Sequence, residues 1–341
     1  MNKLTKIGAS ALCGSLAAVS AANAGELTVT GGADMTWISL EKEVTGNPIG
    51  IGSNMGFTGS GELDNGIGVA LGIYHANTNS YTETNVQITV PSLGTFQVDQ
   101  GSSGTGIDRF DDVTPTVWEE SHGAGVATGI DTVAGVSAGA NIEYTPNMLP
   151  EGITGRIAFS PAAGGSKSGD KASSGDDGSV KQSGFDVVVS ADGNVLGMEG
   201  LTVMAGLSNI NQDAGGSAIS GDIDERTVAV TYAMGAFTIG AQISEEDLGT
   251  ASGVKQYDNM GYGVTFSVND NLSIGYNHFE SEQNNHTTAD VTAEATSLQI
   301  AYTMGGASIR VAEISTDNNN YNSTAAQADD DGTVISLGLA F

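Results

Sequence analysis

The chain has 341 residues, of which 49 are glycine and one is cysteine, and its 40 acidic side chains outnumber the 11 basic ones to give a net charge of −29. This charge excludes a nucleic-acid-binding protein, because such a protein needs a basic surface to neutralise phosphates, and the single cysteine excludes a disulfide scaffold. Apolar residues form 39% of the chain and recur in short regular runs, which argues against disorder.

The first 24 residues have the parts of a secretory signal peptide. Lys3 and Lys6 precede a short, mostly apolar segment, and Ala22-Asn23-Ala24 matches the small-residue cleavage pattern. The apolar segment is too short to span a bilayer, since a membrane helix needs about 20 apolar residues. We therefore expect residues 1–24 to be removed on export, which leaves residues 25–341 as the mature chain, without the only cysteine.

The mature chain is dominated by alternation of apolar and polar residues, the period of a β-strand with one face of each kind. In residues 27–37, Leu27 and Val29 fall on one face, and Thr28 and Asp34 fall on the other. The same pattern predicts sixteen strands in chain order, at residues 27–37, 54–63, 67–75, 83–90, 95–100, 136–144, 152–160, 183–191, 200–209, 225–234, 236–245, 258–268, 272–280, 294–304, 307–315 and 333–341.

Three features favour a membrane barrel over a soluble β-sandwich. The polar face consists of small polar residues, as a wet lumen requires. The connections alternate between tight turns, such as Asp64-Asn65-Gly66, and long polar loops, which is the layout of outer-membrane barrels. The last predicted strand ends on its apolar face at Phe341. Because lipid cannot satisfy an open sheet edge, we predict a closed, all-β transmembrane antiparallel barrel of about sixteen strands, which is wide enough for an aqueous channel.

The longest insertion, residues 101–135, follows the fifth predicted strand and is strongly acidic. Its stretch from Gly106 to Glu120 contains one basic residue, Arg109, and five acidic residues. Those five are Asp108, Asp111, Asp112, Glu119 and Glu120. By composition alone, the insertion is either an exposed acidic loop or a charged part of the channel.

The signal peptide, the sixteen alternating strands, the terminal Phe341 and the acidic insertion together resemble the general diffusion porins of Gram-negative outer membranes. This resemblance extends over essentially all of the mature chain. It implies a homotrimer in the cell outer membrane, in contact with the lipid bilayer and lipopolysaccharide, that passes small hydrophilic solutes and ions by passive diffusion. It also implies that the third loop folds into the barrel, so that Asp108, Asp111, Asp112, Glu119 and Glu120 become candidates for the pore constriction.

The charges expected on the lumen wall depart from the family pattern. The mature chain has four arginines, and two of them, Arg156 and Arg310, have the parity of the polar face, whereas Arg226 has the parity of the apolar face and is expected at the rim. The basic cluster opposite the loop is therefore thin. Further acids are expected on the polar face, and rings of acidic side chains favour cations, so we expect a weak to moderate cation preference. These wall acids are Asp34, Asp99, Glu143 and Asp186.

No residue pattern predicts catalysis or a bound cofactor. The four histidines lack metal-ligand spacing, and no nucleophile elbow or zinc motif is present, which leaves a barrel enzyme without a site. Asp329-Asp330-Asp331 and Asp176-Asp177 could bind Ca²⁺ at loop tips, although solvated acidic loops explain them as well. The alternative function is a secreted soluble acidic β-protein such as a calcium-dependent adhesin, but the glycine-rich nonapeptide repeat of such proteins is absent.

Overall fold

A computed structural model of the protein describes residues 27–42, 47–77, 82–101, 104–164, 180–213, 218–324 and 328–340. The expected signal peptide, the terminal Phe341 and the acidic pair Asp176-Asp177 lie outside these residues.

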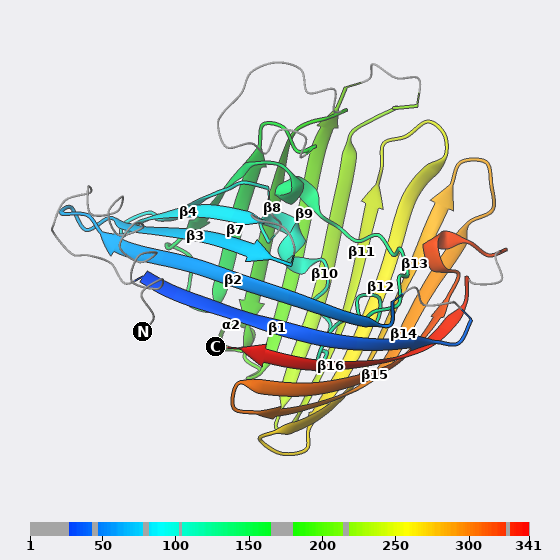
Figure 1. Ribbon diagram of the computed structural model, residues 1–341. Coiled ribbons are helices and arrows are strands. Elements are labelled where there is room, and N and C mark those ends of the chain that lie inside the picture. Colours follow the sequence, from blue (N-terminus) through cyan, green and yellow to red (C-terminus); the bar gives the residue numbers. More distant parts are fainter. Residues whose placement is uncertain are drawn as a thin grey trace.

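Sixteen antiparallel strands close into one barrel, in which each strand pairs with its neighbours in sequence (Figure 1). This confirms the predicted fold class and the number and order of the strands. The strands are β1 (Leu27–Leu40), β2 (Ile49–Glu62), β3 (Gly68–Ala76), β4 (Glu83–Val90), β5 (Gly94–Asp99), β6 (Asn141–Pro146), β7 (Ile153–Ser160), β8 (Lys181–Asp192), β9 (Leu201–Gln212), β10 (Ile223–Met234), β11 (Phe237–Asp247), β12 (Val254–Ser267), β13 (Leu272–Asn285), β14 (Val291–Met304), β15 (Ala307–Asp317) and β16 (Asp330–Ala340).

The barrel closes between its first and last strands, which lie side by side in blue and red in Figure 1. Their antiparallel register runs from Gly32 opposite Ala340 to Leu40 opposite Gly332, with Trp37 opposite Ile335. Every strand therefore has two partners. Closure thus satisfies the backbone N–H and C=O groups of both strands, which an apolar environment could not do.

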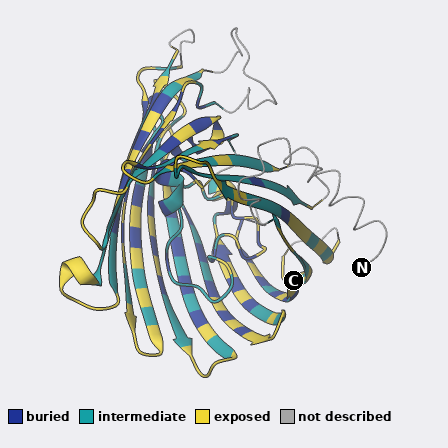
Figure 2. Ribbon diagram, turned by 90° about the vertical axis from the view of Figure 1, so that its left-hand side faces the viewer, coloured by how far each residue is buried: buried dark blue, intermediate teal, exposed yellow. Residues whose placement is uncertain are grey.

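The two faces of the sheet have the reverse polarity of a soluble protein. Outward-facing Leu207 is 61% exposed and Ile243 is 59% exposed, while their neighbours Ser208 and Gln242 are buried on the inner face. Figure 2 shows the resulting alternation of exposed and buried residues along the strands. Lipid is the solvent that such an outer face requires, and a polar inner face suits a wet lumen.

The helices are all short. They are η1 (Gly106–Phe110), η2 (Gly135–Ala138) and η3 (Asn319–Tyr321), which are 3₁₀ turns, and the α-helical turn α2 (Gly193–Leu196). Within the part of the chain that the structure describes, no helix has the length and apolar character needed to cross a membrane.

Glycine allows the shortest turns between neighbouring strands. Between β10 and β11 only Gly235 and Ala236 intervene, and Gly235 has a φ of +59°. The predicted turn after β2 also forms, since Gly66 has a φ of +80° and its N–H donates to the carbonyl of Leu63. These positive φ values are ones that residues with a Cβ atom rarely adopt.

One predicted strand begins later than expected. The strand predicted over 136–144 is observed as β6 over Asn141–Pro146, and η2 occupies the first part of the predicted range. The cause is that Gly135 turns with a φ of +56° and that Val136 packs against Ala158 and Ile210 inside the barrel. The apolar alternation that suggested a strand here belongs to the end of the preceding loop.

Candidate functional site

In its described parts, residues 100–101 and 104–140, the connection between β5 and β6 lies inside the barrel, and we call it the folded loop. Gln242 of β11 donates from its amide to the carbonyl of Phe110 over 2.7 Å. Further along, the N–H of Trp118 donates to the Oε1 atom of Gln299 in β14 over 3.1 Å. These contacts follow the inner wall across successive strands, and they confirm the inward-folded third loop.

Apolar contacts hold the folded loop to the wall at two places. Ile107 and Phe110 of the folded loop pack against Val188 and Met204, and farther along Val126 packs in a second cluster with Val334. Val188 and Val334 both interrupt the polar alternation on the inner face of their strands. Full burial of one such side chain contributes about 1.5–3 kcal/mol, so these interruptions mark where the loop docks.

Two buried carboxylates hold the two ends of the folded loop to the wall. The Oδ2 atom of Asp186 accepts hydrogen bonds from the N–H groups of Ile107, at 3.0 Å, and Val136, at 3.2 Å. The Oε2 atom of Glu225 accepts from Ala134 and Gly135. Asp186 therefore does not stand free in the lumen, as the sequence suggested, because its charge serves backbone N–H groups. Glu225 was not identified from the sequence.

The tip of the folded loop is held by the connection after β15. The N–H of Asn320 donates to the carbonyl of Thr128 over 2.6 Å, and the N–H of Asp131 donates to the hydroxyl of Tyr321 over 2.9 Å. Tyr321 also forms a hydrogen bond with Ser281 of β13. The helix η3 thus fixes the loop tip to the wall.

The acidic residues of the folded loop form a cluster around Asp112. Burial, and next the charge of Asp112, raise the pKa of Asp111 to about 8, and the same two causes raise the pKa of Glu120 to about 8. The pKa of Glu119 is also raised, first by burial and then by Asp112. These shifts show that the four carboxyl groups interact, and Glu119 is exposed while the other three are half-buried. We call Asp111, Asp112, Glu119 and Glu120 the acidic cluster.

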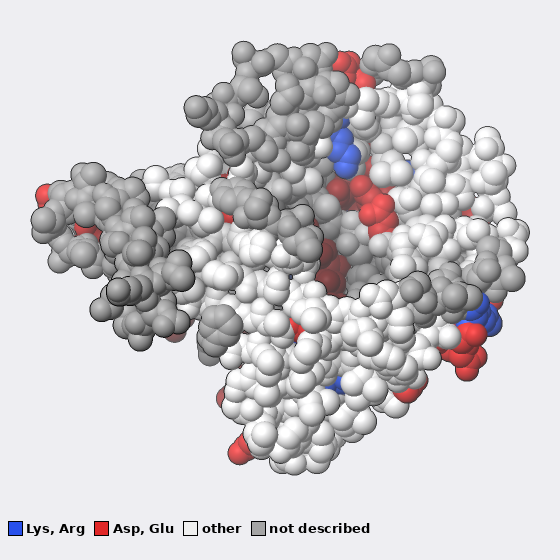
Figure 3. All heavy atoms as spheres, in the orientation of Figure 1, with Lys and Arg blue, Asp and Glu red and all other residues white. Residues whose placement is uncertain are grey.

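Asp108 belongs to the same loop and lies in η1, at the edge of the acidic cluster. Its carboxylate accepts a hydrogen bond from the N–H of Gly104, and burial raises its pKa. In the space-filling view, acidic atoms gather in a hollow of the face seen, and few basic atoms are visible there (Figure 3).

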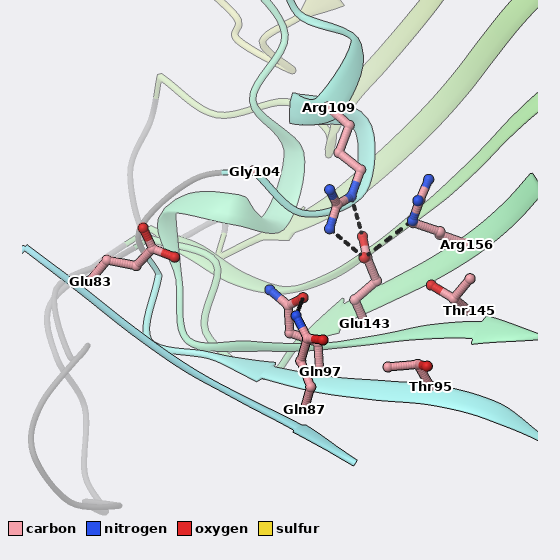
Figure 4. Close-up of a pocket in the computed structure, with 9 residues that line it drawn as sticks. All are labelled: Glu83, Gln87, Thr95, Gln97, Gly104, Arg109, Glu143, Thr145 and Arg156. Carbon is pink, nitrogen blue, oxygen red and sulfur yellow. Dashed lines mark hydrogen bonds and ion pairs between the residues drawn. The ribbon is translucent and has the colours of Figure 1, made fainter. Parts of the chain in front are cut away.

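The inward arginines are paired with wall acids. Arg109 of the folded loop donates to both oxygens of Glu143, at 2.7 and 3.1 Å, and the Nε atom of Arg156 lies 3.6 Å from the same carboxylate (Figure 4). On another part of the wall, the Nη2 atom of Arg310 lies 3.4 Å from the Oδ2 atom of Asp34. The guanidinium carbon of Arg310 lies 5.5 Å from the ring centre of Trp118. Both Arg156 and Arg310 have the inward direction that their parity predicts.

The comparison with known families decides which class of protein has this architecture. The sequence model of the family described as Gram-negative porin matches residues 8–322. The chain belongs to the Gram-negative porin family. It is therefore an outer-membrane protein, and its family and fold indicate a channel rather than an enzyme.

Solved structures similar to this porin share its fold at low sequence identity. OmpF of Salmonella typhi, in complex with daunomycin, has a TM-score of 0.69 and 12% identity, with 93% of this chain and 98% of that chain covered. OmpT, an outer-membrane protein of Vibrio cholerae, has a TM-score of 0.66 and 13% identity, with 94% and 98% covered. The anion-selective porin from Comamonas acidovorans has a TM-score of 0.64 and 14% identity, with 93% and 100% covered. No curated protein sequence matches the chain significantly.

The remaining charged residues that the sequence singled out lie away from the open channel of the porin. Asp99 is buried, and its Oδ1 atom accepts from the N–H of Gly101 over 2.8 Å, so it supports the start of the folded loop instead of lining the lumen. Arg226 has a side chain that is 64% exposed and pairs with Glu245, in agreement with its outward parity.

Two of the acids in the loop-tip segment Asp329-Asp330-Asp331 accept hydrogen bonds from backbone N–H groups. Asp329 accepts from the N–H of Asn318, and Asp330 accepts from the N–H of Lys42. Within the described residues, no three His, Cys, Asp or Glu side chains are grouped in a way that could hold a metal ion.

Inward-facing glycines give the folded loop room to lie against the wall. A Cβ atom on Gly263 would lie 2.3 Å from the carbonyl oxygen of Pro115, and one on Gly240 would lie 2.6 Å from the ring of the same proline. These two glycines are paired across β11 and β12. Their role was not identified from the sequence, because a glycine is also compatible with a polar face.

We expect the Gly263→Ala variant of the porin to displace the folded loop from β12 and to change the single-channel conductance. The added methyl group overlaps backbone, which cannot rotate away, and overpacking of this kind costs about 1–3 kcal/mol. Conductance in planar bilayers and unfolding in urea measure the two effects. Gly59→Ala is the matched control, because nothing lies within 4 Å of the added Cβ atom. Equal conductance of the two variants would contradict the contact.

Proposed function

We propose that this porin is a water-filled channel through which small hydrophilic solutes and ions diffuse passively, with a preference for cations. The observation that supports the cation preference is the imbalance of charge at the folded loop. Arg109, Arg156 and Arg310 each have a carboxylate partner on the wall. The acidic cluster forms no ion pair with any basic side chain that the structure describes. The uncompensated charge in the lumen is therefore negative.

A negative lumen concentrates cations and repels anions, and water cannot screen this field fully inside a narrow pore. The interior needs no chemistry for this function, and we include in the proposal that transport requires no cofactor. Asp108, with its carboxylate held at η1, contributes to the same field at the edge of the acidic cluster. The proposed constriction therefore consists of Asp108 and the acidic cluster.

The surroundings of the porin follow from its outer surface. We propose that the apolar outer face contacts the lipid bilayer, that the loop ends contact lipopolysaccharide, and that three copies associate. The outward Gly31 and Ala33 of β1 would allow close approach between subunits. Conductance steps that occur in groups of three support the trimer, and single steps of equal size contradict it.

Passive diffusion is tested by swelling of liposomes that contain the purified, folded protein. We expect the swelling rate to fall steadily as the size of an uncharged sugar increases, and to stay proportional to the gradient, because diffusion through water-filled space has no saturable step. Absence of solute-dependent swelling from correctly folded protein would contradict the proposal.

Cation preference is expected to increase as the pH rises between about 7 and 9. The pKa values of Asp111 and Glu120 are raised to about 8. A carboxyl group with a raised pKa stays neutral below that value and carries its charge above it, so the lumen becomes more negative as the pH rises. Reversal potentials in a KCl gradient, recorded at several pH values, measure this change.

The control for the pH dependence is Asp112→Asn. The charge of Asp112 is the second cause of both raised pKa values, so its removal should shift the titration of the remaining cluster toward lower pH. A cation preference that falls with rising pH, or that is unchanged by this variant, would show that the acidic cluster does not set the selectivity.

A further inference from the structure

A polar pocket separate from the acidic cluster lies where the folded loop meets the wall formed by β4 to β7. Its volume is about 660 Å³. One side is formed by Arg109, Arg156 and Glu143. The other side is formed by inward side chains of β4, β5 and β6, which include Glu83, Gln87, Gln97 and Thr145 (Figure 4).

On the basic side of the pocket, two arginines, Arg109 and Arg156, share one carboxylate, that of Glu143. Glu143 is engaged by Arg109 through two hydrogen bonds and by the N–H of Gly106, and its side chain is only 3% exposed. Arg156 reaches this carboxylate through its Nε atom alone, at 3.6 Å, and its side chain is 26% exposed. Two guanidinium groups around Glu143 make this side of the pocket basic, whereas Glu83, the second acidic residue of the lining, lies at the other side, away from Arg156 (Figure 4).

The terminal nitrogens of Arg156 are available to a ligand. Within the described residues, no hydrogen bond from either of them is recorded, and in Figure 4 they point away from Glu143. A guanidinium edge with two N–H groups side by side matches the two oxygens of a carboxylate in one plane. The geometry of Arg156 therefore favours an organic acid over a spherical anion.

The wall beside Arg156 offers neutral hydrogen-bonding groups. In the strand register, Gln87 is opposite Gln97, which is opposite Glu143, and the next inward pair is Thr95 opposite Thr145. The amide of Gln87 donates to Gln97 over 3.2 Å, which leaves the amide nitrogen of Gln97 free to donate to a ligand. Amides and hydroxyls in two adjacent rows are the groups that bind the hydroxyls of a sugar, since each can donate and accept.

We propose that this pocket is a binding subsite for a small polyhydroxy carboxylate, of the sugar-acid class. The carboxylate binds Arg156, with Arg109 adding positive charge, and the hydroxyl groups bind Gln97 and Thr145. The inference rests on the proposed channel function, because the solute reaches the pocket through the lumen. It adds to that function a solute that the field of the acidic cluster alone would exclude.

The test uses D-gluconate as the ligand, with acetate as the charged control and D-glucose as the neutral control. In planar bilayers, gluconate should reduce the KCl conductance in a saturable way, whereas acetate and glucose at the same concentration should not. Arg156→Gln should weaken the apparent affinity for gluconate by about tenfold or more, since a charge-assisted hydrogen bond is lost. Gln97→Leu should weaken it several-fold, because only the hydroxyl contacts are lost.

Arg226→Gln is the matched control, because this arginine is exposed on the outward side of β10 and should leave gluconate binding unchanged. Equal effects of acetate and gluconate, or an unchanged affinity in Arg156→Gln, would overturn the subsite. Calorimetry with gluconate on the folded protein in detergent tests the pocket even when no current is recorded. A porin that conducts KCl but does not bind gluconate retains the proposed function and loses the subsite, whereas folded protein without conductance loses the proposed function.

Discussion

Conversion of the acidic cluster to its amides, by Asp111→Asn, Asp112→Asn, Glu119→Gln and Glu120→Gln together, is expected to abolish the cation preference of the channel. The amides keep the size of the side chains, so that the folded loop retains its path while the negative charge is lost. The ratio of K⁺ to Cl⁻ permeability should fall several-fold, to about one, and the reversal potential in a KCl gradient should approach zero.

The matched control replaces the same number of acidic side chains on the short-turn side of the barrel. Glu62, Asp64, Glu151 and Glu199 are exposed there, and none lies in the folded loop. The combination Glu62→Gln, Asp64→Asn, Glu151→Gln and Glu199→Gln should leave the permeability ratio nearly unchanged. If both sets of substitutions lower the ratio equally, selectivity depends on total charge and the acidic cluster has no special role.

Removal of the two buried anchors, by Asp186→Ala and Glu225→Ala together, is expected to free the folded loop from the wall and to enlarge the conductance. The two carboxylates accept hydrogen bonds from four N–H groups at the two ends of the loop. A typical hydrogen bond contributes about 0.5–1.5 kcal/mol, so the loss of four should weaken the docking of the loop substantially. The barrel should still close, since its strand pairing does not involve these side chains.

Single-channel conductance and the rate of proteolysis within residues 100–140 measure this release. The control is Asp224→Ala with Glu199→Ala, because Asp224 is exposed beside Glu225 in the same strand and accepts a hydrogen bond from the amide of Asn209, outside the folded loop. A loop that resists proteolysis equally in both double variants would show that the apolar contacts of Ile107 and Phe110 hold it without the carboxylates.

The barrel could be predicted from the sequence because the alternation of apolar and polar residues is a local pattern. Alternation assigns each residue to a face, so the directions of Arg156, Arg226 and Arg310 follow from parity. The boundaries were less predictable at the loop ends, where polar strand residues such as Lys255 and Gln256 carry no apolar alternation. Before β6 the alternation was misleading, because Val136 packs inside the barrel and the chain forms the 3₁₀ turn η2 there.

The partners of the charged side chains could not be predicted, because they join residues far apart in the sequence. Parity places Glu143 and Asp186 on the inner face, but it does not show that Arg109 and the N–H of Ile107 reach them. One signal was present in the sequence: Val187-Val188-Val189 is apolar on both faces, and the inward Val188 marks the docking place of Phe110. The acidic cluster was found because its residues are close in sequence.

The central claim is that the folded loop sets a cation preference in a water-filled pore, and one recording tests it most directly. Purified, folded protein is placed in a planar bilayer with unequal KCl concentrations on the two sides and neutral pH. The current should rise in steps, and it should reverse at a potential with the sign expected for a channel that prefers K⁺. Absence of conductance, or a reversal potential of the sign for Cl⁻, would contradict the account.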